Sequence, residues 1–125
     1  MRKHQGIILA SALLAMAAGA PALAHHSYAM FDAQQNKQLD GVVQAFKWTN
    51  PHSYIEVMVM DDKGQAQTWG VECGSPAQMV RAGWRSSSLK PGDKVIVTVH
   101  PLRDGTPGGS FVQVQTPDGR VLKAS

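Results

Sequence analysis

The chain has 125 residues, of which 43% are hydrophobic and 17% charged, with a formal net charge of +3 and a single cysteine. This length and composition suit one globular domain with a modest core. The single cysteine, Cys73, excludes an internal disulfide bond, so stability must come from packing or from a ligand.

The N-terminal segment, residues 1–24, has the features of a secretory signal peptide. Arg2 and Lys3 precede an uncharged apolar run over residues 7–18, and an Ala-Leu-Ala tripeptide at 22–24 matches the small-residue cleavage site. The apolar run is shorter than the ~20 residues needed to cross a bilayer. We therefore predict cleavage after Ala24, export to the periplasm and no membrane span after processing.

Processing changes the charge balance. Cleavage after Ala24 removes Arg2 and Lys3, so ten basic side chains remain against nine acidic ones, a net charge of +1. A nearly neutral chain has no general attraction to nucleic acid or to an anionic membrane. We expect neither as a partner.

The mature chain is predicted to have a short arm followed by one β-domain over residues 37–125. Residues 25–36 are polar and aperiodic, and we expect this arm to dock through Tyr28, Met30 and Phe31. Alternating apolar residues separated by turn residues then predict strands. They are Lys37–Trp48 with a bend or bulge at Gly41, Ser53–Asp61, Gln67–Cys73, Lys94–His100, Ser110–Thr116, and a last short strand near Arg120–Leu122.

The second and third strands each have a clear apolar face. The residues expected to face inward are Ile55, Val57, Val59, Trp69, Val71 and Cys73. We expect Cys73 to be a small buried hydrophobic residue; intermolecular pairing and metal ligation are the alternatives.

A short helix is predicted between the third and fourth strands. Ser75 can cap it, Pro76 suits its first position, and Gln78 completes a capping box. Gly83 is the expected stop. The apolar residues Met79, Val80 and Trp84 are expected to close an opening in the β-domain.

The element order is β-β-β-α-β-β, with the helix between strands three and four. This order predicts an OB-like fold, a five-stranded Greek-key barrel with one short helix. A small β-sandwich is the alternative, although a sandwich would not require a helix at this position.

Two loops of such a barrel flank its usual binding face. The first contains Asn50 and His52, and the second begins at His100 and contains Arg103. A two-residue turn at Lys63-Gly64 would place Tyr54 opposite Cys73 and bring Glu72 to the same end of the hairpin as His52. The candidate ligand-binding residues are Asn50, Tyr54, Glu72 and Arg103.

These polar residues also have plainer interpretations. His52 can fix its turn through a side-chain hydrogen bond, and His100 can be a surface residue at a strand end. Glu72 can pair with Arg81 or Arg85, or stay solvated.

A metal site is the alternative interpretation. After cleavage at Ala24, His25 would carry a free α-amino group and an imidazole, which together chelate Cu(II) well. His52 or His100 could supply a third nitrogen. The candidate metal ligands are His25, His26, His52 and His100, with copper as the possible cofactor.

Several short motifs resemble a known family. They are Ala24-His25-His26-Ser27, Trp48-Thr49-Asn50-Pro51-His52, Glu72-Cys73-Gly74-Ser75-Pro76, Arg81-Ala82-Gly83-Trp84 and Leu89-Lys90-Pro91-Gly92-Asp93. The set resembles a family of small exported bacterial proteins known only as a domain of unknown function. The resemblance implies a signal peptide, a periplasmic location, an OB-like barrel and a site at the Trp48–His52 loop, but no reaction.

The chain contains no G-x-S-x-G, no H-E-x-x-H and no paired-cysteine zinc pattern. We therefore predict no enzyme activity. The expected function is a non-catalytic module of the cell envelope, monomeric or weakly oligomeric, that binds a small ligand or an envelope protein. The alternative is a periplasmic copper-binding protein that uses His25 with His52 or His100.

Overall fold

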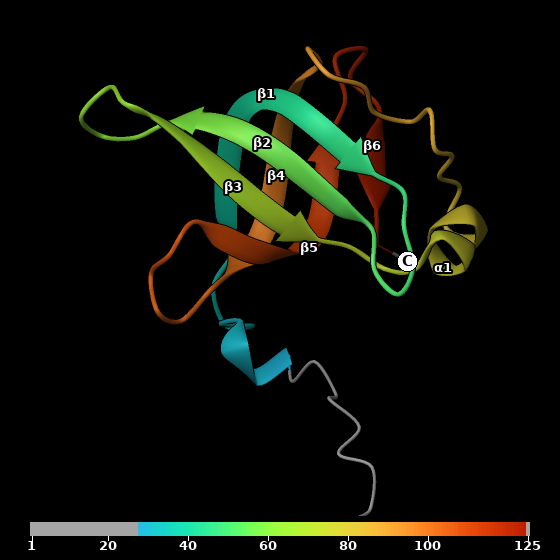
Figure 1. Cartoon of the computed structure of the whole chain (residues 1–125), viewed down its shortest axis with the longest axis horizontal. Helices are drawn as coiled ribbons and strands as arrows, with labels where there is room; N and C mark the ends of the chain where they lie inside the picture. Colours follow the sequence, from blue (N-terminus) through green and yellow to red (C-terminus); the bar gives the residue numbers. More distant parts are fainter. Residues whose placement is uncertain (1–27, 125) are drawn as a thin grey trace, which may run out of the picture.

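A computed structural model of the chain describes residues 28–124. In chain order its elements are η1 (Tyr28–Met30), β1 (Lys37–Lys47), β2 (Tyr54–Met60), β3 (Ala66–Glu72), α1 (Pro76–Arg81), β4 (Lys94–Pro101), β5 (Gly108–Gln115) and β6 (Val121–Lys123) (Figure 1). The predicted signal peptide and the start of the predicted arm, residues 25–27, lie outside this range. Within it, no helix is both long and apolar enough to cross a membrane.

Strands β1 to β5 close into a barrel. Four antiparallel pairings join β3 to β2, β2 to β1, β1 to β4 and β4 to β5, and a parallel pairing of β3 with β5 completes the circle. The predicted OB-like barrel is confirmed, because the β3–β5 pairing joins edges that a sandwich would leave apart. Strand β6 pairs with β5 and stands outside the barrel.

The core lies inside the barrel and follows the predicted alternation. Ile55, Val57 and Val71 have no exposed surface, and Trp69 and Cys73 are 7% and 6% exposed. The prediction of Cys73 as a small buried residue is therefore confirmed. The core of the described chain comprises Leu39, Val43, Ile55, Val57, Trp69, Val71, Cys73, Met79, Trp84, Leu89, Val95, Val97, Val99, Phe111 and Val114.

The irregularity predicted at Gly41 has two parts. The shift in pairing between β1 and β2 falls between Val43 and Ala45, after the glycine. Gly41 itself lies so close to β2 that an added Cβ would collide with the carbonyl oxygen of Met58 and lie 2.8 Å from Val57 Cγ1. The glycine therefore permits close strand packing, and the bulge follows it.

The β2–β3 hairpin differs by one residue from the predicted register. Tyr54 pairs with Glu72, not with Cys73. The turn is longer than predicted, because the Asp61 N–H donates to the Gln65 carbonyl and Gly64 takes a positive φ of 74°. The side chain of Asp61 accepts backbone N–H bonds from Lys63 and Gln65, each 2.8 Å long, and these bonds favour the longer turn.

Helix α1 begins as predicted. Ser75 accepts the N–H of Gln78 while the Gln78 side chain accepts the N–H of Ser75, which forms a capping box. Met79 and Trp84 belong to the core, but Val80 is 58% exposed, so its predicted part in closing the barrel is wrong. The physical reason is the helical period: the residue after Met79 points about 100° away from it.

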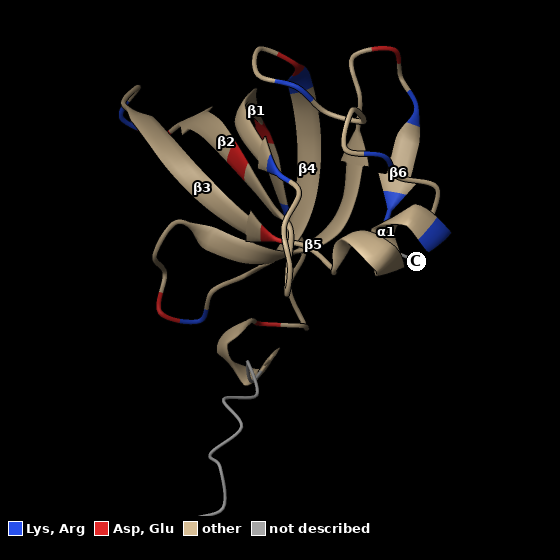
Figure 2. Ribbon diagram, turned by 45° about the vertical axis from the view of Figure 1, so that its right-hand side comes forward, with Lys and Arg blue, Asp and Glu red and all other residues tan. Residues whose placement is uncertain are grey.

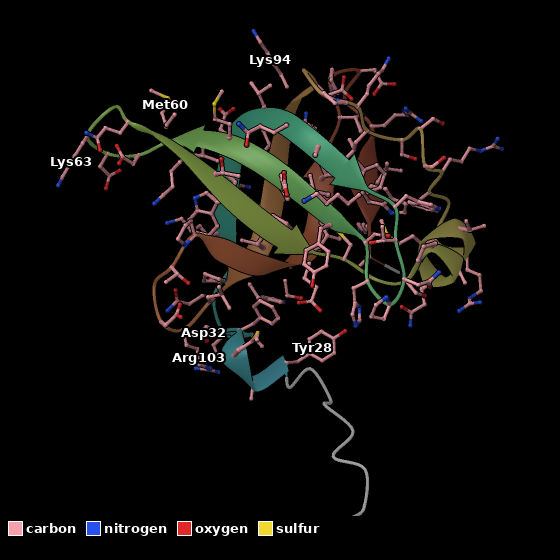
Figure 3. The ribbon with its side chains drawn as sticks, viewed as in Figure 1. Tyr28, Asp32, Met60, Lys63, Lys94 and Arg103 are labelled. Atoms are coloured by element: carbon pink, nitrogen blue, oxygen red, sulfur yellow. The ribbon has the colours of Figure 1, made fainter. Side chains whose placement is uncertain are left out.

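The predicted arm packs against the β4–β5 loop. The N–H of Asp32 donates to the Pro101 carbonyl at 2.8 Å, and the N–H of Arg103 donates to the Met30 carbonyl at 2.9 Å. Of the three residues predicted to dock, Phe31 is buried, whereas Tyr28 and Met30 are exposed. Figure 3 shows η1 directly beside Arg103 and Asp32.

Candidate functional site

The candidate site centres on Glu72, the last residue of β3. Its backbone pairs with Tyr54 on β2 and with Ser110 on β5, so it lies where β3 and β5 close the barrel. Figure 2 shows acidic colour at this end of β3, next to β5. The strand alternation turns the Glu72 side chain away from the core, yet the residue is only 8% exposed.

The Glu72 carboxylate is buried without a full set of partners. Among the described residues, its Oε1 atom and the hydroxyl of Ser53 are the buried side-chain atoms that have no hydrogen-bond partner. The group in ion-pair geometry with Oε1 is Nε2 of His52, at 3.8 Å. The sequence predicted that Glu72 is solvated or pairs with Arg81 or Arg85, and neither prediction is correct. Glu72 is buried, and in the described range no ion pair joins it to either arginine.

The imidazole of His52 is oriented by the backbone next to Glu72. Its Nδ1 lies 3.2 Å from the carbonyl oxygen of Cys73. A carbonyl only accepts, so Nδ1 carries the proton in this bond and Nε2 faces the carboxylate. The predicted grouping of His52, Glu72 and Cys73 at one end of the hairpin is therefore confirmed.

The hydroxyl of Tyr54 is the second polar group near the carboxylate. Burial raises the pKa of Tyr54 above its ordinary value of 10, and the negative charge of Glu72, a hydrogen bond with Glu72 and the neighbouring Cys73 raise it further. At neutral pH the phenol therefore stays protonated and acts as a hydrogen-bond donor.

Two pockets meet at Glu72. The first has a volume of about 570 Å³, and its lining residues include Tyr28, Glu72, Cys73, Gln78, Arg81, Ser110, Phe111 and Ala124. The second has a volume of about 440 Å³, and its lining residues include Phe31, Tyr54, Glu72, Leu102 and Arg103. The N-terminal segment therefore contributes to both pockets, through Tyr28 in the first and Phe31 in the second.

The remaining predicted site residues lie elsewhere or have other partners. Nδ1 of His100 donates a 2.8 Å hydrogen bond to the carbonyl of Gln35, and His100 lines a separate pocket with Lys123. Asn50 is exposed in the turn before β2 and lines neither pocket at Glu72. Arg103 lines the second pocket but also holds the arm, through a 3.0 Å bond from its Nε to the carbonyl of Ala29.

The predicted metal ligands are only partly described. Residues 28–124 contain no group of three or more His, Cys, Asp or Glu side chains placed to hold a metal ion. His52 lies beside Glu72, whereas no pocket or hydrogen bond of the described chain joins His52 to His100. His25 and His26 lie outside the described residues, so the predicted N-terminal chelate stays a prediction.

Several pocket residues were missed from the sequence, notably Ser110 and Phe111. The available signal was the pair Gly108-Gly109, which precedes them. A Cβ at Gly109 would lie 2.8 Å from Val99, so the glycine lets β5 approach β4 and brings Ser110 beside Glu72.

Cys73 gives a testable consequence of this burial. Burial raises the pKa of its thiol far above the ordinary value of 9, and the charge of Glu72 raises it further, against a smaller opposing effect of a backbone hydrogen bond at Ile55. The native thiol should react with a disulfide reagent at pH 8 roughly 100-fold more slowly than the unfolded thiol, because only the exposed thiolate is reactive.

The raised pKa of the Cys73 thiol also makes the stability of the fold depend on pH. Because the folded state holds the thiol proton more tightly than the unfolded state, the stabilisation from this proton is complete below pH 9 and is lost as the pH rises above 9.

Absorbance assays in buffer and in guanidinium chloride, with a Cys73→Ala control, measure the rates at which the disulfide reagent modifies the folded and the unfolded thiol. Complete modification of the folded protein at the unfolded rate would contradict the expected burial.

Comparison with known proteins gives a family. A model of a family of unknown function, DUF6152, matches residues 12–112, and the match includes β2, β3, α1 and the first part of β5. No curated protein and no solved structure matches the chain significantly. The resemblance to a domain of unknown function is therefore confirmed, and the chain belongs to the family DUF6152.

Proposed function

We propose that the protein is an exported, non-catalytic binding module whose ligand places a positive charge at Glu72. The observation that carries this proposal is the buried carboxylate, which has an oxygen without a hydrogen-bond partner among the described residues. A buried acceptor atom without a hydrogen-bond partner is costly, typically by about 1–3 kcal/mol and by more when its group is charged. A cation that enters the pocket would supply the missing interaction.

The dimensions of the site support a small ligand. The larger pocket, of about 570 Å³, falls within the usual ~300–1,000 Å³ of small-molecule sites. Tyr28 and Phe111 provide aromatic surface in this pocket, and aromatic faces attract cations. A small cation therefore matches both the charge and the lining of the site.

Two further points belong to the proposal. The basic start, apolar run and small-residue tripeptide within residues 1–24 support export to the periplasm. The proposal assigns no reaction, and the thiol of Cys73, which follows Glu72 in the chain, is buried and protonated.

The test is a titration of the isotope-labelled protein, followed by amide NMR, with two separate probes: Zn²⁺ and n-butylammonium. We expect at least one probe to shift the amides of Glu72 and Ser110 with saturation. A Glu72→Gln variant keeps the shape and removes the charge, and we expect roughly tenfold weaker binding, as for the loss of a charge-assisted bond.

A Glu56→Gln variant is the matched control, because Glu56 pairs with Lys47 on the outer face of the barrel. Its binding should equal that of the unaltered protein. If neither probe shifts these amides, or if Glu72→Gln binds both probes unchanged, the proposed function is overturned.

A further inference from the structure

We infer that His52 and Glu72 are a donor pair for one divalent transition-metal ion, with the carbonyl of Cys73 orienting the imidazole. This inference rests on the proposed cation-binding function and names the class of cation. It also extends the predicted ligand set, which combined His25 with His52 or His100 and did not include Glu72.

The first support is the separation of the two donor atoms. Nε2 of His52 lies 3.8 Å from Oε1 of Glu72. Hydrogen bonds from nitrogen to oxygen extend only to about 3.2 Å, so this distance is too long for one. A metal ion lies about 2.0–2.1 Å from an imidazole nitrogen and about 2.0–2.2 Å from a carboxylate oxygen, so one ion can contact both atoms.

The second support is the way the imidazole is held. Metal-binding histidines commonly donate their other ring N–H to a backbone carbonyl or a carboxylate, which fixes the ring and the tautomer. Nδ1 of His52 makes this bond to Cys73, the residue that follows Glu72. The same stretch of backbone therefore carries the carboxylate and orients the imidazole toward it.

The third support is burial. The side chains of His52 and Glu72 are 21% and 9% exposed, so an ion between them would be largely shielded from water. Electrostatic attraction is stronger in such surroundings. Glu72 also lines the pocket that contains Tyr28.

The donor types narrow the choice of metal. Imidazole nitrogen with carboxylate oxygen suits Zn²⁺, Cu²⁺, Ni²⁺ and Fe²⁺, and Cu²⁺ binds such sites most tightly among the divalent ions. Mg²⁺ and Ca²⁺ prefer sets made of oxygen alone. We therefore assign a first-row transition metal, with Cu²⁺ as the ion that binds most tightly.

The two protein donors leave coordination positions of the ion that water can fill.

The experiment uses the protein produced from the full chain, with its first residue determined by mass spectrometry. Cu²⁺ alone is titrated and followed by electron paramagnetic resonance and by competition with a chelator. We expect one tightly bound ion, and about 10- to 100-fold weaker binding in His52→Ala and in Glu72→Gln. His52→Ala should also lose one coordinated nitrogen from the spectrum.

His100→Ala is the matched control, because His100 bonds to Gln35 and lines a different pocket.

A variant that misfolds would also lose metal binding, so a second measurement uses the unaltered protein. In nitrogen NMR with Zn²⁺, the Nε2 signal of His52 should change to that of a metal-bound nitrogen while Nδ1 keeps its proton.

Unchanged affinity in His52→Ala, or no change at Nε2 with Zn²⁺, would overturn the metal pair. If n-butylammonium still shifts the amides of Glu72 in that case, the proposed cation-binding function stands and only the metal assignment fails. If neither cation depends on Glu72, both fail.

Discussion

Replacing Trp84 by alanine should lower the free energy of unfolding by about 3–5 kcal/mol. Trp84 is 1% exposed and makes an edge-to-face contact with Phe111, with 5.3 Å between the ring centroids. It also packs against Phe46, with 5.8 Å between the ring centroids. Its Nε1 donates a 2.8 Å hydrogen bond to the carbonyl of Lys123 in β6. The substitution therefore opens a cavity at the end of the barrel and also releases the last strand.

Urea and thermal denaturation measure this effect. A loss of about 3 kcal/mol corresponds to a melting temperature lower by about 12 °C or more for a domain of this size. Val80→Ala is the control, because Val80 is 58% exposed on the same segment and should change stability by less than about 0.5 kcal/mol. Equal losses in both variants would show that Trp84 is not part of the core.

Replacing Glu72 by glutamine should raise the free energy of unfolding of the ligand-free protein by about 1–2 kcal/mol, although the variant binds its ligand more weakly. The carboxylate is buried, and its Oε1 has no hydrogen-bond partner in the described chain. The glutamine side chain is neutral, so the variant no longer keeps an incompletely hydrogen-bonded charge away from water. Sites that serve binding often carry such a cost.

Urea denaturation of the metal-free protein, dialysed against a chelator, measures this gain. Glu56→Gln should stay within about 0.5 kcal/mol, because its ion pair with Lys47 is on the surface. A Glu72→Gln variant that is less stable than the starting protein would show that the carboxylate supports the fold. The burial of Glu72 would then be structural, and the reason for a ligand at this position would be lost.

Most of the fold could be predicted from the sequence because its signals are local. The apolar alternation of β2 places Ile55 and Val57 in the core, and the capping box at Ser75 starts α1 at the expected residue. The position of this helix between β3 and β4 was enough to favour the barrel. Each of these signals depends on residues close together in the chain.

The errors arise where the result depends on detail beyond the local pattern. The side-chain bonds of Asp61 lengthen the hairpin turn and shift the register by one residue. Val80 is apolar but follows Met79, which already takes the inward direction. The burial of Glu72 could not be predicted, because it depends on the barrel closure and on segments far away in the sequence.

The larger pocket at Glu72 is lined by residues from nearly the full length of the described chain, since Tyr28 and Ala124 both contribute to its wall. A ligand there is thermodynamically linked to the folding of the complete domain, and its occupancy stabilises the native state by mass action. Fraying at either end would remove part of the wall and lower the population that is competent to bind. Affinity at this site is therefore also a measure of how completely the chain has folded.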